Sequence, residues 1–124
     1  MMHLLAVALG GAIGSLLRYW ISGWLNTPEG RLPVGTLSIN VIGSLLMGIA
    51  FVLIMEKARL SPELRPLIMT GMLGGFTTFS TFSLEAVSLL NEGHTGAALI
   101  YVLLSVILCI TALYLGLWFT RLFF

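Results

Sequence analysis

The sequence predicts an all-α membrane protein whose four helices form one transmembrane domain. The chain has 124 residues, of which 58% are hydrophobic and only 9% are charged. Soluble globular domains usually carry about 25% charged residues, so this composition excludes that class. Four apolar blocks of about 20 residues or more can each cross about 30 Å of hydrocarbon. Three polar segments separate them and hold all four prolines and nearly all the charges.

We expect the four spans at about residues 4–25, 34–55, 67–90 and 97–121, within one domain covering residues 1–124. No Lys or Arg precedes the first apolar block, which exceeds the hydrophobic core of a typical signal peptide, so we expect it to remain as a span. The single cysteine, Cys109, excludes an intrachain disulfide. No basic run indicates a nucleic-acid partner, and no nucleophile–base pair or ligand cluster indicates an enzyme.

The first span carries small residues four positions apart, at Ala6, Gly10 and Gly14. This spacing lets two helix backbones approach closely, and we interpret it as packing rather than chemistry. Arg18 is different, because it lies within the span about two turns before the first polar segment. Its guanidinium either extends to the membrane surface or lines a wet vestibule, since charges inside spans are functional candidates.

Two other spans carry polar residues at four-residue spacing, which places each set on one helical face. In the second span these are Thr36, Asn40 and Ser44, and in the fourth they are Tyr101, Ser105 and Cys109. The Asn40 amide either bonds a neighbouring helix, which its residue type alone favours, or offers N–H donors to an anion. Tyr101 either anchors the helix at the membrane interface or turns its hydroxyl toward the same path as Ser105.

The third span contains a segment, GMLGGFTTFSTFS at residues 71–83, that departs from the pattern of a membrane helix. Gly-Gly in a helix interior costs about 2 kcal/mol relative to Ala-Ala, and hydroxyl groups in hydrocarbon require partners. We therefore expect this span to be broken near residues 74–77. If Gly74 and Gly75 interrupt the helix, freed carbonyls can coordinate a cation, and the following half-helix presents a positive N-terminal end.

Beyond this predicted break, Phe79 and Phe82 are three residues apart and point to similar faces. Ser80 and Thr81 lie between them on another face. An aromatic pair at this spacing either packs in the core or, among so many hydroxyl groups, lines a narrow polar path. Glu85 follows one turn later and is expected near the membrane boundary.

Three motifs in this order closely resemble the Fluc family of fluoride channels, also called CrcB. They are GGAIGSLLRY at residues 10–19, GTLSIN at 35–40 and GMLGGFTTFSTFSLE at 71–85. The resemblance covers essentially the whole chain, and the third motif is its specific part. It implies an antiparallel, dual-topology homodimer in the prokaryotic inner membrane. Such a dimer would conduct fluoride passively out of the cell through two pores and lower cytoplasmic fluoride toxicity.

The resemblance also implies roles for individual residues. The pore residues would be Asn40, Phe79, Phe82, Ser80, Thr81, Tyr101 and Ser105. Arg18 and Glu85 are vestibule candidates. Backbone carbonyls of Gly74 and Thr77 from both copies would hold a structural sodium ion, Na+, at the dimer interface. Cys109 stands where some relatives are expected to carry a small polar residue such as Ser. The implied partners are fluoride, sodium, the lipid bilayer and a second copy.

Fluoride holds its water tightly, so a selective path must replace that water with amide and hydroxyl donors and with the positive edges of phenylalanine rings. With no Lys or Arg in mid-span, such a path would not trap the ion. The main alternative is a small multidrug-resistance-like proton-coupled exporter, which needs a carboxylate in mid-span. Glu85 is the only acid in a predicted span, and it lies near an end. A non-transporting scaffold bundle would leave residues 71–83 unexplained.

Basic residues give only a weak prediction of orientation. The side of the N-terminus carries four of them, Lys57, Arg59, Arg65 and Arg121, against Arg18 and Arg31 on the other side. This bias favours a cytoplasmic N-terminus and is also compatible with insertion in both directions.

Overall fold

A computed structural model describes residues 2–26 and 32–124, and its regular elements within these ranges are all helical. In the described residues, four segments are long and apolar enough to cross a membrane: Met2–Leu25, Val34–Glu56, Arg65–Asn91 and Thr95–Phe123. The prediction of an all-α chain with four such helices is therefore confirmed. Residues 27–31 lie outside the described residues. They include most of the first polar segment and Arg31, which the prediction of orientation used.

The first two spans are α1 (Met2–Leu25) and α2 (Val34–Phe51), and α2 continues into a π-helical turn, η1 (Val52–Glu56). The third span consists of a π-helical segment, η2 (Arg65–Leu73), followed by the short α3 (Gly74–Phe76) and by α4 (Ser80–Asn91). The fourth span is α5 (Thr95–Phe123). Between α4 and α5, Gly93 has a φ of 84°, a left-handed conformation that ends the helix.

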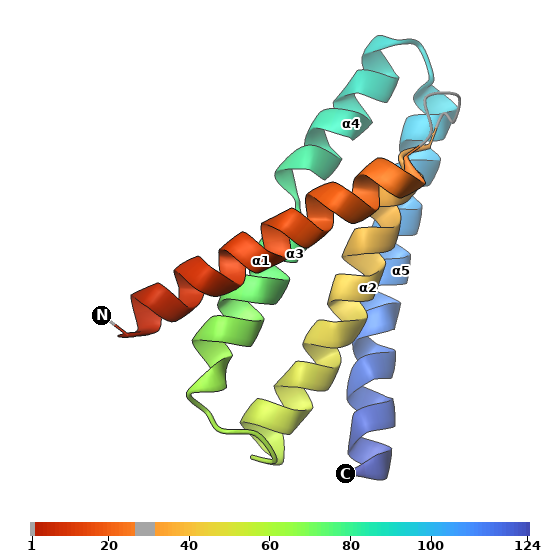
Figure 1. Cartoon of the computed structure of the whole chain (residues 1–124). Helices are drawn as coiled ribbons and strands as arrows, with labels where there is room; N and C mark the ends of the chain where they lie inside the picture. Colours follow the sequence, from red (N-terminus) through yellow and green to blue (C-terminus); the bar gives the residue numbers. More distant parts are fainter. Residues whose placement is uncertain (1, 27–31) are drawn as a thin grey trace.

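Close backbone contacts hold the spans together. Figure 1 shows α2 and α5 side by side, while α1 crosses obliquely over the green η2 segment. At this crossing Gly10 and Gly14 are buried. A Cβ added at Gly71 would lie 3.0 Å from the Cα of Gly10, and one at Gly75 would lie 2.8 Å from the carbonyl oxygen of Gly11. The predicted packing role of the small residues of the first span is confirmed at Gly10 and Gly14.

A second close contact joins α2 and α5. A Cβ added at Gly116 would lie 3.4 Å from the Cα of Gly48. Near the C-terminus, Arg121 forms a two-pronged ion pair with Glu56: Nε donates to Oε2 over 2.9 Å and Nη2 to Oε1 over 2.6 Å. These contacts fix the two helices that form one wall of the groove described below.

The third span is interrupted after Phe76. Thr77 is extended, with φ −86° and ψ 158°, and helical structure resumes at Ser80. Gly74 and Gly75 themselves belong to α3, and Gly74 has helical angles of −62° and −40°. The break therefore lies at the Thr77 end of the predicted range 74–77, just beyond the Gly-Gly pair. The reason is that Gly75 serves the close contact with α1, whereas the extended backbone after it is held by side-chain hydrogen bonds.

Candidate functional site

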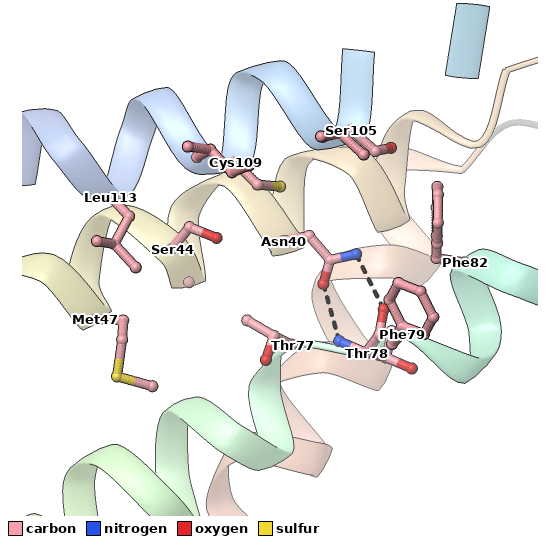
Figure 2. Close-up of a pocket in the computed structure, with 13 residues that line it drawn as sticks. Asn40, Ser44, Met47, Thr77, Thr78, Phe79, Phe82, Ser105, Cys109 and Leu113 are labelled. Carbon is pink, nitrogen blue, oxygen red and sulfur yellow. Dashed lines mark hydrogen bonds between the residues drawn. The ribbon is translucent and has the colours of Figure 1, made fainter. Parts of the chain in front are cut away.

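Asn40 connects α2 to the break in the third span. Its Nδ2 donates to the carbonyl oxygen of Thr78 over 3.0 Å, and its Oδ1 accepts from the Thr78 N–H over 2.8 Å (Figure 2). Unpaired backbone groups are costly inside a bilayer, so this pairing stabilises the interruption. Nδ2 carries a second N–H beyond the one that Thr78 uses. Asn40 thus bonds a neighbouring segment, as its residue type favours. It also keeps one side-chain N–H that could bind a ligand.

A groove with a volume of about 350 Å³ opens beside the Asn40–Thr78 pair. Its polar side chains come from two helices and from the break: Asn40 and Ser44 on α2, Ser105 and Cys109 on α5, and Thr77 and Thr78 between α3 and α4 (Figure 2). The two polar stripes expected from four-residue spacing therefore meet beside the groove. None of the residues lining it carries a charge.

Ser105 places a buried hydroxyl group beside the groove. The residue is only 6% exposed, and its hydroxyl oxygen has no hydrogen-bond partner within the described residues. A buried hydroxyl without a partner costs about 1–3 kcal/mol, so such groups are usually paired with a ligand or water. The groove therefore offers a free donor at Ser105, in addition to the second N–H of Asn40.

Three aromatic rings form a row at one end of the groove. The ring centres of Phe79 and Phe82 are 5.5 Å apart, and those of Phe82 and Tyr101 are 5.1 Å apart. Phe82 is 8% exposed and belongs to a buried cluster with Tyr101, whereas Phe79 is 79% exposed. Of the two alternatives for the phenylalanine pair, core packing thus describes Phe82 alone. Both rings line the groove.

Tyr101 is fully buried, so its ring lies between helices. Its hydroxyl donates to Oε1 of Glu85 over 3.3 Å, and the buried Thr36 hydroxyl lies beside it. Tyr101 does not itself line the groove, but its ring contacts Phe82, which does. Tyr101 therefore links the aromatic row to the half-buried Glu85 carboxylate on α4.

Ser80 and Thr81 begin α4 and lie beside the groove without lining it. The Thr78 hydroxyl accepts from the Thr81 N–H over 3.2 Å and lies 3.5 Å from the Ser80 hydroxyl. Because the first N–H groups of a helix have no partner within it, this is a helix cap, and the helix end is partially positive. Of the predicted pore residues, Asn40, Phe79, Phe82 and Ser105 line the groove, and the other three flank it.

Arg18 turns inward to the third span. Its Nε donates to the carbonyl oxygen of Gly75 over 3.0 Å, and the residue is partly buried. This bond joins α1 to α3 one residue before the end of α3. The guanidinium of Arg18 therefore points inward and lies beside the break. The predicted alternative in which it extends to the membrane surface does not describe this conformation.

The break leaves three backbone oxygens without a partner in the described part of the chain. The carbonyls of Leu73, Gly75 and Thr78 accept hydrogen bonds from Thr77, Arg18 and Asn40. Within residues 2–26 and 32–124, no such bond reaches the carbonyls of Gly74, Phe76 and Thr77. The same residues contain no group of three or more His, Cys, Asp or Glu side chains that could hold a metal. A hard cation held here would therefore use backbone oxygens.

Sequence reasoning did not single out Thr78, whose backbone and hydroxyl organise the break. It also missed Gly43 and Met47 as groove residues. Gly43 matters because the methyl group of Thr77 packs where its side chain would be. The tandem threonines directly after the Gly-Gly pair were an available signal for Thr78, since hydroxyl side chains bond nearby backbone groups where a helix is interrupted.

Comparison with known proteins agrees with these features. Residues 5–117 match the family described as "CrcB-like protein, Camphor Resistance (CrcB)". A Hahella chejuensis protein named "Fluoride-specific ion channel FluC" is 52% identical over 121 residues, which cover 97% of this chain and 95% of that protein. The protein of the same name from Saccharophagus degradans is 52% identical over 109 residues, covering 87% of this chain and 81% of that protein.

A third protein of that name, from Rhizobium meliloti, is 48% identical over 118 residues, which cover 94% of each chain. With its four membrane-crossing helices, the chain is a multi-pass membrane protein. The resemblance of its three motifs is confirmed, and the chain belongs to the CrcB family.

Proposed function

We propose that this protein is a fluoride-selective ion channel that exports fluoride passively and so lowers its toxicity in the cytoplasm. The groove is the observation that carries the proposal. It combines the unpartnered Ser105 hydroxyl, the spare N–H of Asn40 and the edges of two phenylalanine rings. Such groups can replace the water around a small anion, and without a charged side chain they do not bind it too tightly to release. The names of the relatives, which are described as fluoride-specific channels, support fluoride as the anion.

The proposed channel is an antiparallel homodimer with two pores, whose copies insert in opposite orientations. Three exposed residues along the break support a second copy there. Phe79 is 79% exposed, and Ser80 and Gly74 are exposed as well. A hydroxyl in hydrocarbon is unfavourable without a partner. The nearest atom to a Cβ added at Gly74 is the Met69 carbonyl oxygen at 3.6 Å, an ordinary contact. Nothing in the described part of the chain therefore requires a glycine there, whereas a closely packed second copy would.

A structural sodium ion at the centre of the dimer is the proposed cofactor. The free carbonyl oxygens of Gly74 and Thr77 have the hard-donor character that such a cation requires. One chain supplies two of them, fewer than a buried cation needs, so a second copy would complete the site. The ion would contribute a fixed positive charge between the two pores. Arg18 and Glu85 are proposed to shape the approaches to each pore.

We place the channel in the prokaryotic plasma membrane, the inner membrane where two membranes are present. Fluoride enters cells as neutral HF at acid pH and dissociates inside. The membrane potential across an energised membrane then drives the anion outward without a coupled energy source. The proton-coupled exporter gains no support, since no acidic side chain lines the groove. In keeping with a family whose named members are ion channels, the chain is not an enzyme.

Reconstitution tests the proposal. Liposomes that contain the purified protein and are loaded with potassium fluoride should release fluoride rapidly once valinomycin provides a path for potassium. Liposomes loaded with potassium chloride should retain their anion under the same conditions. Absence of fluoride release, or equal release of chloride, would show that the protein is not a fluoride-selective channel. Accessibility labelling that finds a single orientation would contradict the antiparallel dimer, and sodium-free purified dimers would contradict the cation.

A further inference from the structure

The groove carries one thiol among its amide and hydroxyl groups. Cys109 is the one cysteine of the chain and lies one helical turn beyond Ser105 on the same face of α5 (Figure 2). Its side chain is partly buried and lies beside the Ser44 hydroxyl of the facing helix. The thiol therefore borders the same space as the four predicted pore residues that line the groove.

The unpartnered hydroxyl of Ser105 is a second, independent sign that a small polar ligand enters this space. It is buried, lines the groove and bonds to nothing in the described part of the chain. An ion path that reaches Ser105 and Asn40 also connects the space beside Cys109 to the aqueous solution. This matters because the thiolate is the reactive form of cysteine, and a thiol facing only hydrocarbon stays protonated and inert.

We propose that Cys109 is a modification site for small thiophilic reagents and that a group attached there closes the ion path. The closing of the path rests on the proposed function, whereas the access of water to the thiol does not. With methyl methanethiosulfonate, the thiolate sulfur attacks the methylthio sulfur of the reagent. A disulfide bond forms, the sulfur–sulfonyl bond breaks, methanesulfinate leaves with the electron pair and the thiol proton passes to water.

The modification acts on the path in two ways. It replaces a weak S–H donor by a methyl group, which cannot replace the water around an anion. It also places an apolar group between the two polar stripes, opposite Ser44. Apolar constrictions in narrow paths exclude water and ions. Both effects act on the dimensions and donors of the path and leave the helix packing at Gly48 and Gly116 untouched.

The test measures fluoride release from liposomes before and after treatment with methyl methanethiosulfonate. The rate of each variant after treatment is compared with its own rate before treatment. Release by the natural chain should fall by about tenfold or more, as expected for a blocked narrow path, and recover after dithiothreitol. The Cys109→Ser variant should keep its own rate. Ile107→Cys in that background is the matched control, because Ile107 is 58% exposed and lies on the opposite face of α5. This variant should also keep its rate.

Intact-mass measurement separates the possible outcomes. One methylthio group on Cys109 together with loss of release supports the site, whereas complete labelling with unchanged release overturns it. Absence of labelling in membranes, when the unfolded protein labels fully, overturns it too. If no variant releases fluoride before the reagent, the proposed function fails instead. In that case a charged, lipid-impermeant methanethiosulfonate tests whether water reaches the Cys109 thiol. Labelling of Cys109 supports this access, and absence of labelling overturns it.

Discussion

Asn40 and Thr78 form a reciprocal pair in which one side-chain amide satisfies both backbone groups of the other residue, over 3.0 Å and 2.8 Å. This pair holds α2 against the extended backbone between α3 and α4. The same amide borders the groove and keeps one N–H free. The residue that stabilises the break is therefore also one that keeps a free N–H donor beside the groove, the donor that we propose for the ion.

Replacement of Asn40 by Ala should both destabilise the protein and slow fluoride release. It leaves the N–H and carbonyl of Thr78 unpaired, at a cost of about 1–3 kcal/mol in the free energy of unfolding. Thermal unfolding in detergent and release from liposomes measure the two effects. Ser44→Ala is the control, since Ser44 lies one turn away on the same face of α2. It should change release with little loss of stability. Equal losses of stability in both variants would contradict the structural role of Asn40.

Phe79→Ile and Phe82→Ile should each slow fluoride release, because an aliphatic side chain lacks the positive ring edge that faces an anion. Phe79 is 79% exposed, so its substitution should leave the unfolding of the single chain almost unchanged. Phe119→Ile is the control: Phe119 is a half-exposed ring on α5 outside the groove. Release rates for Phe79→Ile and Phe82→Ile that equal the rate of this control would show that the two rings only pack.

The two glycines before the break should respond in opposite ways. A methyl group at Gly75 would lie 2.8 Å from the backbone of Gly11, so Gly75→Ala should cost about 1–3 kcal/mol through overpacking. At Gly74 the nearest contact is 3.6 Å, so Gly74→Ala should leave the fold of one chain intact. It should instead lower the fraction of dimer, measured by cross-linking in lipid. An unchanged dimer fraction would show that Gly74 is not at the interface between copies.

Two turn residues provide a test of stability away from the groove. Ala58 has a φ of 50°, a left-handed conformation that costs a residue with a Cβ about 1–2 kcal/mol. Ala58→Gly should therefore raise the thermal unfolding midpoint. Gly93 has a φ of 84°, so Gly93→Ala should lower the midpoint by a similar amount. If Ala58→Gly lowered it instead, the left-handed conformation at Ala58 would be wrong. Neither change should alter fluoride release.

The candidate site was partly predictable from the sequence. Four-residue spacing placed Asn40 with Ser44 and Ser105 with Cys109, because residues at that spacing share a helical face whatever surrounds the helix. The glycines and hydroxyl residues of 71–83 marked an interrupted span. What could not be predicted was that the helix continues through Gly75, which depends on how closely α1 approaches from elsewhere in the chain.

By itself the sequence determined the number of spans, the two polar stripes and the family, since hydrophobic length, helical period and motif order are properties of neighbouring residues. Only the tertiary structure decided that the stripes meet beside the groove, that Asn40 pairs with Thr78 and that Arg18 turns inward to Gly75. It also left the carbonyls of Gly74 and Thr77 free, while those of Leu73, Gly75 and Thr78 accept hydrogen bonds. These outcomes depend on contacts between residues far apart in the chain. Local helix propensity does not determine which of those residues meet, because that depends on how the helices pack.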